Sequence, residues 1–438
     1  MKTTFKKIIS YILKIESRFV LWKYKPKVIA ITGSVGKTST KDAVYGIISK
    51  ISYVRKSEKS YNSEIGLPLI ILGCPNGWNN PYVWLKNILK GLWLFIWPHK
   101  YPEWLVLEVG VGKPGDMRQT ASWFKTDAVI ITAIGETPVH IEFFNSRDHL
   151  VKEKSGLIKT LKKDGLLILN ADDKTVLELK TKSKNRTLTF GFSEDADVRG
   201  SEESILYSDS GLPAGEAGLP QGIIFRVDEG GNSLPVIIEG VFGKNHLYAS
   251  LAALAFFYGL KFNILDAINA LKNYDVPPGR MRLLSGINNS LIIDDSYNSS
   301  PFACESALKT LGEIKSVGRK IAVLGDMLEL GKYTEESHKN IGKIAEKNAE
   351  ILIVVGPRAK TIEEGAVLAG MNEKNIFEFN NSRETGEFLK TFVKNGDLVL
   401  VKGSQGMRME RAVEAVLKDK ENKEKLLVRQ DKEWLEKE

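Results

Sequence analysis

The sequence predicts an α/β protein in which two parallel sheets follow one another along the chain. Short runs rich in β-branched residues alternate with helical patterns, which is typical of parallel strands joined by crossover helices. The strands expected in the first half are 28–32, 104–109, 128–134 and 166–170. Those of the second half are 290–295, 320–326, 350–356 and 397–404. The second series predicts a separate, Rossmann-like C-terminal domain.

Residues 195–240 break this alternation. They are rich in Gly, Pro and Ser, and they contain short strand-like pieces. We interpret them as a small antiparallel insertion in the first domain. The expected organisation is therefore a basic amphipathic helix (1–26), a central domain (27–283) with a Trp-rich insertion (78–104), a Rossmann-like domain (284–420) and a charged, solvated tail (421–438).

The positive charge is concentrated at the N-terminus. The chain of 438 residues has a formal net charge of +8, and residues 1–27 contain eight Lys or Arg against the single acid Glu16. The rest of the chain is nearly neutral, which argues against a nucleic-acid-binding groove. Cys74 and Cys304 lie far apart without the spacing of metal ligands. Two isolated cysteines suit a reducing compartment, and we expect a cytoplasmic protein.

Two segments have the pattern of amphipathic helices. Apolar residues recur at helical spacing between Phe5 and Trp22, with lysines among them. The stretch 78–104 contains five of the eight tryptophans, and its part 82–97 is apolar except on one helical face. Such helices lie on the surface of a membrane or pack on a neighbouring domain. The sequence leaves both open, including a peripheral position on the inner face of the plasma membrane through 1–26 and 78–104.

A glycine-rich loop directly follows the first expected strand and precedes a helical stretch. Glycines in such a loop let backbone N–H groups surround a phosphate, and the helix N-terminus adds a favourable dipole. Lys37 is placed to reach the terminal phosphates, and Thr38 to bind Mg²⁺. The sequence therefore predicts an ATP site. Its loop residues are Gly33, Ser34, Val35, Gly36, Lys37, Thr38 and Ser39.

This loop, one residue shorter than the usual eight-residue motif, resembles that of Mur ligases and folylpolyglutamate synthetases. Further motifs that resemble the Mur ligase family, and within it the MurF type, follow in family order. They are 61–68 (YNSEIGLP), 108–110 with 114–116, 140–144 with 152–154, 170–173, 278–281, 294–301 (DDSYNSSP), 324–331 (LGDMLELG) and 402–404. The segments 294–301 and 324–331 point most directly to the MurF type.

The resemblance implies an ATP-dependent ligase that joins an amine to a carboxylate through an acyl phosphate. Its implied reaction adds D-alanyl-D-alanine to a UDP-N-acetylmuramoyl-tripeptide in peptidoglycan precursor synthesis. The implied cofactors are ATP and two Mg²⁺ ions, and the partners are these small-molecule substrates, without nucleic acid. We expect a monomer.

The resemblance also assigns roles to individual residues. The implied metal ligands are Thr38, Glu108, His140 and Lys154, the last as a carbamylated lysine. The implied catalytic residues are Lys37, Lys154, His140 and Arg280. Asp295, Tyr297 and Asn298 are expected to approach the nucleotide from the C-terminal domain. Asn62, Ser63, Lys402 and Ser404 are expected to contact substrates.

One departure from the family pattern keeps alternatives open. Only about thirty residues precede Gly33, whereas the MurF type has a complete domain for the uridine-diphosphate sugar at this place. One alternative is therefore a related ligase of the Mur or folylpolyglutamate kind that acts on another carboxylate, lipid-linked acids included. Another is a non-catalytic, nucleotide-binding scaffold at the membrane. The intact Lys37, Thr38, Glu108 and Lys154 argue against the scaffold.

Overall fold

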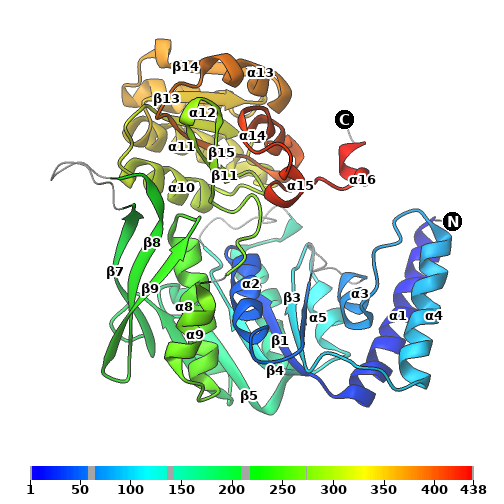
Figure 1. Ribbon diagram of the computed structural model, residues 1–438. Coiled ribbons are helices and arrows are strands. Elements are labelled where there is room, and N and C mark those ends of the chain that lie inside the picture. The colour runs from blue at the N-terminus through cyan, green and yellow to red at the C-terminus, as the bar shows by residue number, and fades with distance from the viewer. Residues whose placement is uncertain (1, 58–64, 136–142, 209–217, 273, 437–438) are drawn as a thin grey trace.

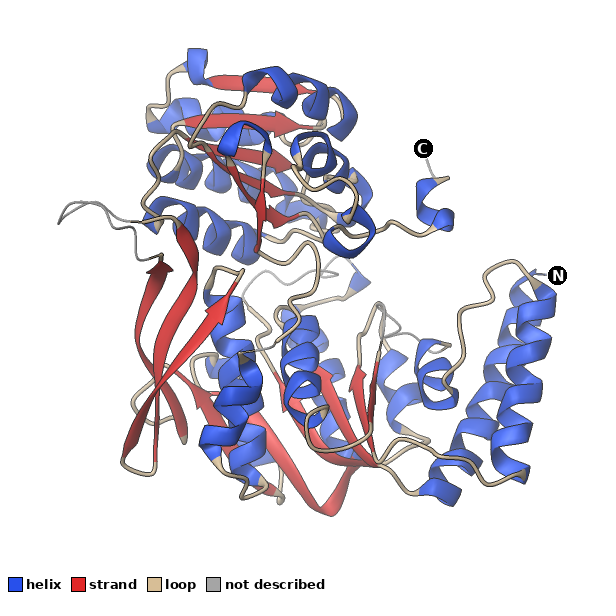
Figure 2. Cartoon of the chain, viewed as in Figure 1, coloured by secondary structure: helices blue, strands red, loops and turns tan. Residues whose placement is uncertain are grey.

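The computed structural model consists of two α/β lobes joined near residue 280 (Figure 1). It describes residues 2–57, 65–135, 143–208, 218–272 and 274–436. The first lobe contains a nine-stranded sheet of order β2-β3-β1-β4-β5-β6-β7-β8-β9, and the second a six-stranded sheet of order β10-β11-β15-β12-β13-β14. Helices lie against both sheets (Figure 2).

The strands of the first sheet are β1 (Lys27–Thr32), β2 (Val54–Lys56), β3 (Trp104–Glu108), β4 (Thr126–Ile131), β5 (Leu161–Asn170), β6 (Arg186–Gly191), β7 (Val198–Tyr207), β8 (Pro220–Glu229) and β9 (Asn232–Glu239). Those of the second are β10 (Arg282–Ser285), β11 (Leu291–Asp295), β12 (Lys320–Gly325), β13 (Ile351–Val355), β14 (Ile376–Phe379) and β15 (Leu398–Lys402). The strands β1 to β7 pair in parallel with one another, as do β11 to β15, while β8, β9 and β10 pair antiparallel to their neighbours.

The helices of the first lobe are α1 (Lys2–Tyr24), α2 (Lys37–Ile48), α3 (Gly66–Leu72), α4 (Pro81–Ile96), α5 (Asp116–Ala121), α6 (Arg147–Ser155), α7 (Lys174–Leu177), α8 (Lys244–Gly259) and α9 (Ile264–Leu271). Those that follow are α10 (Pro301–Glu313), α11 (Thr334–Asn348), α12 (Lys360–Ala369), α13 (Ser382–Phe392), α14 (Glu410–Val416), α15 (Lys423–Leu426) and α16 (Lys432–Leu435).

The central strand β1 explains how the first lobe is layered. Its side chains alternate between the two faces of the sheet, as in every strand. Ile29 and Ile31 lie in a core shared with α2 and α8, whereas Val28 and Ala30 lie in a second core shared with α1 and α3. Because both faces of β1 are covered, its run of apolar residues has no polar alternation.

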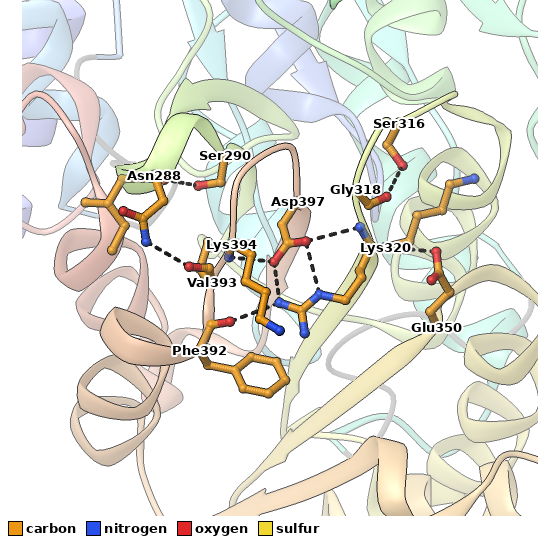
Figure 3. A network of polar contacts seen from close by, with 12 residues as sticks. Asn288, Ser290, Ser316, Gly318, Lys320, Glu350, Phe392, Val393, Lys394 and Asp397 are labelled. Carbon is orange, nitrogen blue, oxygen red and sulfur yellow. Dashed lines mark hydrogen bonds and ion pairs between the residues drawn. The ribbon is translucent and has the colours of Figure 1, made fainter.

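A polar network closes the second sheet at the end where β11, β12 and β15 begin (Figure 3). The buried carboxylate of Asp397 accepts hydrogen bonds from the backbone N–H groups of Arg319 and Lys394 and from the Arg319 guanidinium, at 2.5 to 3.1 Å. Asn288 donates to the carbonyl oxygen of Val393 in the same network. These contacts join three chain segments at the start of the strands, the end of the sheet opposite to Asp295 and Lys402.

The structure confirms the predicted α/β class with a parallel first sheet, an antiparallel extension formed by β7, β8 and β9, and a second sheet. The limits of the segments at residues 26, 283 and 420 stay predictions. The expectation of a solvated tail is wrong for part of 421–438, because Leu427 is buried and the Arg429 guanidinium pairs with buried Glu410 at 2.7 Å. Among the described residues, we find no helix long and apolar enough to cross a membrane.

Candidate active site

The glycine-rich loop connects β1 to α2, as predicted. Gly33 has φ +147° and Gly36 has φ +84°, and a Cβ atom on Gly33 would lie 2.0 Å from the hydroxyl oxygen of Thr132. The N–H groups of Ser34 and Val35 donate to the carbonyl oxygen of Ala133. Since Gly36 has no side chain to cap α2, the N–H groups of the first helical turn are open to an anion.

Lys37, Thr38 and Glu108 lie together beside this loop. β3 pairs in parallel with β1 so that Glu108 is opposite Ile31, directly before the loop. The Thr38 hydroxyl donates to Oε2 of buried Glu108 at 2.9 Å. Burial lowers the pKa of Lys37, the Glu108 carboxylate opposes this effect, and nearby Arg280 adds to it. The hydrogen bond and the charges of these three side chains therefore influence one another directly.

Lys154 approaches the same loop from a segment that is distant in sequence. It belongs to α6, is 2% exposed, and its amine donates to the carbonyl oxygen of Gly33 at 3.0 Å. Burial, and to a lesser extent the neighbouring cation of Lys37, holds the pKa of Lys154 well below its ordinary value. A primary amine in this position is inside the phosphate site rather than on a solvated helix face.

Arg280 joins the two lobes at this point. Its Nη2 donates to the Thr38 hydroxyl oxygen at 3.3 Å, and its guanidinium carbon lies 4.0 Å from the centre of the Tyr297 ring. Within the described residues, the buried Nε of Arg280 has no hydrogen-bond partner. The guanidinium thus faces the loop with unused donor capacity, as a group that binds phosphate requires.

The C-terminal lobe contributes a second polar cluster. β11 and β15 are parallel neighbours with Asp295 opposite Lys402. The Lys402 amine lies 2.6 Å from Oδ2 of Asp295 and 2.9 Å from the carbonyl oxygen of Asn298. Ser404 accepts a hydrogen bond from the backbone N–H of Leu328 at 2.8 Å. Lys402 and Ser404 therefore already have protein partners, and a direct contact with substrate stays a prediction.

Two cavities adjoin the loop. The smaller, about 50 Å³, lies between the lobes and is lined by Gly36, Ser39, Asn245, Arg280, Asn298 and Lys402, among others. The larger, about 940 Å³, opens beside it, and its walls include Thr132, Arg147, Asn170, Asp172, Tyr248 and Glu336. Gly36 and Val35 line both. The larger volume is in the range of small-molecule sites, so phosphates at the loop and a nucleoside beside it fit the combined space.

Three predicted site residues, His140, Asn62 and Ser63, lie outside the described residues. The others form one arrangement: Lys37, Thr38, Glu108 and Lys154 around the loop, with Arg280 bridging to Tyr297 and the cluster of Asp295, Asn298 and Lys402.

Sequence reasoning did not select some residues near the loop. His246 is buried, its Nε2 donates to the carbonyl oxygen of Arg280 at 2.7 Å, and burial lowers its pKa to about 4. The hydroxyl of Tyr274 donates to the carbonyl oxygen of Ser39. These hydrogen bonds position the backbone of the linker and of α2, and His246 also lines the smaller cavity. Asn245, next to His246 at the start of α8, lines both cavities. The glycine directly before this helix is the sequence signal that could have pointed to Asn245.

The donor atoms fit a magnesium ion. Mg²⁺ in nucleotide sites takes hydroxyl and carboxylate oxygens together with phosphate oxygens, and Thr38 and Glu108 offer such a pair. The buried hydroxyl of Ser34 has no hydrogen-bond partner within the described residues. No group of three or more His, Cys, Asp or Glu side chains suited to a metal occurs in the described part of the chain. A magnesium site here therefore depends on phosphate oxygens and on the Thr38 hydroxyl in addition to the Glu108 carboxylate.

A phosphate-binding loop at a cleft between two α/β lobes, closed by a cation from the linker, defines a class of ATP-dependent enzymes that activate one substrate and join it to another. Family comparison narrows this class. The Mur ligase middle domain matches residues 31–256, and the Mur ligase glutamate ligase domain matches residues 279–405. The chain belongs to the Mur ligase family and is an ATP-dependent ligase.

Individual relatives agree with this assignment. A Bacillus subtilis protein named UDP-N-acetylmuramoyl-tripeptide–D-alanyl-D-alanine ligase is 28% identical over 89% of this chain and 76% of its own length. The Escherichia coli protein of the same name is 25% identical over 89% and 76%. A crystal structure of MurF ligase from Thermotoga maritima in complex with ADP has a TM-score of 0.74 and 26% identity, covering 95% of this chain and 84% of that one.

Proposed function

We propose that this ligase uses ATP to add D-alanyl-D-alanine to a UDP-N-acetylmuramoyl-tripeptide in the synthesis of peptidoglycan precursors. The main support is the convergence of Lys37, Thr38, Glu108 and Lys154 on the phosphate loop, with Arg280 facing them from the linker between the lobes. The names of relatives that align with about nine tenths of the chain supply the substrate class. We also propose that the protein is a monomer and that it acts in the cytoplasm, where ATP is found.

In the proposed chemistry, an oxygen of a substrate carboxylate attacks the γ-phosphate of ATP and ADP leaves, which gives an acyl phosphate. The amine then attacks the acyl carbon, loses a proton and displaces phosphate. Both steps bring negative groups together, so the protein must supply positive charge and N–H donors at the reacting centre. The first turn of α2 offers N–H groups to the phosphates, Lys37 offers a cation on one side, and Arg280 offers a second from the linker. Arg280 can therefore clamp the transferred phosphate only when the lobes are together.

Magnesium is part of this proposal. We propose two Mg²⁺ ions held by Thr38, Glu108, Lys154 as a carbamate, and His140. Bound there, the metal would neutralise the charge that develops on the phosphates. A carbamate would convert the Lys154 amine, a donor to Gly33, into an oxygen ligand on the same side of the loop. We expect Lys154→Ala to lose most activity, and a small carboxylic acid such as acetate, which can occupy the space of the missing side chain, to restore part of it. The ¹³C NMR signal of a carbamate formed from labelled bicarbonate should appear only in wild type.

Release of phosphate from ATP tests the function. We expect release that requires both D-alanyl-D-alanine and the uridine-linked tripeptide, with one phosphate per amide bond formed. Release that requires a different carboxylate would transfer the assignment to the alternative ligase, which includes lipid-linked acids. Absence of release with every acceptor, together with tight ATP binding, would support the scaffold.

A further inference from the structure

The helices α1 and α4 form a parallel pair at one edge of the first lobe (Figure 1). The Phe19 and Phe95 rings are 4.9 Å apart, and the Lys23 amine donates to the carbonyl oxygens of Leu94, Phe95 and Trp97 at 2.7 to 3.1 Å. A lysine at this position satisfies the last carbonyls of α4 and complements the helix dipole. The two helices are therefore held in fixed register.

One side of the pair is already buried. Ile9, Leu13 and Val20 of α1 and Trp84 and Leu94 of α4 lie in the core that includes α3 and the sheet. The carboxyl of Glu16 packs against Gly91, where a Cβ atom would lie 2.1 Å from Oε2. These contacts account for the inner side of both helices and for their close approach.

The outer side of the pair exposes large apolar side chains, which we call the helix-pair face. Those of α1 recur at helical spacing, as do those of α4. The members are Ile8, Tyr11, Phe19 and Trp22 from α1, and Tyr82, Leu85, Leu89, Leu92, Trp93, Ile96 and Trp97 from α4 and its end. Leu89 is 57% exposed, Trp93 54% and Trp22 70%. Large apolar side chains exposed together along two paired helices mark an interaction site.

Cations gather at one end of this face. At the C-terminal end of α1, a cavity of about 480 Å³ is lined by Arg18, Lys25, Lys125 and Lys162 together with the rings of Trp22 and Trp123. Lys162 is paired with Asp127 at 2.8 Å, whereas Arg18 is exposed beside Trp22. Residues 1–27 as a whole carry eight basic residues and one acid. Cations and indole rings at the margin of an apolar face are the composition of an interfacial membrane-binding surface.

We propose that the helix-pair face docks on a bilayer that contains anionic phospholipid, with its apolar side chains at the acyl boundary and a lipid phosphate in the cavity of Arg18 and Lys25. A second copy of the chain is a poorer occupant, because two faces with the same positive margin repel one another. An acidic, lipid-bearing surface satisfies both the apolar and the cationic parts. The helix-pair face belongs to α1 and α4 and does not include the phosphate loop between β1 and α2. The docking proposal therefore does not depend on which carboxylate the enzyme uses.

Co-sedimentation of the full chain with vesicles tests this proposal. We expect binding to phosphatidylcholine vesicles that contain about one third phosphatidylglycerol, and binding at least about tenfold weaker to phosphatidylcholine alone. The double substitution Leu89→Glu with Trp93→Glu should weaken binding by about tenfold or more, because charges enter the apolar boundary poorly. The matched control is Val317→Glu with Leu368→Glu, two exposed apolar residues of the other lobe.

A second pair of variants tests the cationic part. Arg18→Gln with Lys25→Gln should weaken binding to the anionic vesicles by about tenfold, whereas Lys343→Gln with Lys347→Gln on α11 should leave it unchanged. Melting temperature and phosphate release without lipid should stay at wild-type values in all four variants. Equal binding to both vesicle types, or equal binding by wild type and Leu89→Glu with Trp93→Glu, would overturn the proposal. So would a wild-type dimer that is lost in that variant while no vesicle binding is seen.

Discussion

Replacing Glu108 with glutamine tests the active-site arrangement most directly. Glu108 is 3% exposed, ends β3 opposite Ile31, and accepts the hydrogen bond of the Thr38 hydroxyl at 2.9 Å. Its negative charge also opposes the effect of burial on the pKa of Lys37. Glutamine keeps the size and one acceptor oxygen but removes the charge. The substitution therefore acts on electrostatics with little change in packing.

The expected loss follows from these contacts. A hydrogen bond to a charged group contributes about 1.5–3 kcal/mol, and loss of a carboxylate suited to Mg²⁺ adds to it. We expect a total of about 2–4 kcal/mol in transition-state stabilisation, which corresponds to a fall in kcat/KM of about 30- to 1,000-fold. Since the side chain keeps its shape, we expect the free energy of unfolding to change by about 1 kcal/mol or less.

Phosphate release at varied ATP concentration measures the kinetic effect, and thermal unfolding measures stability. The matched control is Glu103→Gln, which makes the same change directly before β3, at the other end of the strand, where the carboxylate accepts a hydrogen bond from Ser52 at 2.7 Å. The control should retain wild-type kinetics. Glu108→Gln activity within twofold of wild type would show that our electrostatic account of this site is wrong.

Two further variants probe the linker and the second sheet. Arg280→Met should lower kcat/KM by about 100-fold, because the guanidinium contacts Thr38 and Tyr297, while Arg282→Met should change it little; equal effects of both would refute the clamp. Asp397→Asn should destabilise the protein by about 2–3 kcal/mol, because it removes the charge of a buried carboxylate that pairs with a partly exposed Arg319. Burial alone would raise the pKa of Asp397, but hydrogen bonds from Arg319 and Lys394 outweigh it and lower the pKa below its ordinary value of 3.8. The stability that this carboxylate provides is therefore present above about pH 3.8 and is lost as the pH falls further, so the two proteins should converge in unfolding experiments in acid.

The fold was predictable wherever burial left a continuous apolar run. The expected strand 104–109 corresponds to β3 and the expected strand 320–326 to β12, because both are covered on two faces. Two short strands at the sheet edges, β2 and β14, were missed. β14 has only four residues, of which none is fully buried, and β2 has three, so neither produces a detectable pattern.

The site was predictable for motif residues and less so for their surroundings. The positions of the residues from Gly33 to Thr38 relative to one another were predictable, because the loop and the first turn of α2 are contiguous in sequence. His246 and Tyr274 reach the same loop through tertiary packing, and no local pattern distinguishes them from ordinary core residues. The partners of Lys402 likewise follow from the pairing of β11 with β15, which becomes visible only in three dimensions.

The antiparallel extension has a consequence for how the lobes can move. Val241 bridges to Arg282 where the chain passes between lobes, and the Tyr207 hydroxyl at the far end of β7 accepts a hydrogen bond from the backbone N–H of Lys315. If the C-terminal lobe is held at these two points, it can rotate only about the line that joins them. Motion that preserves both contacts rotates the C-terminal lobe about this axis, and it carries Asp295 and Lys402 toward or away from the phosphate loop with which they line the smaller cavity.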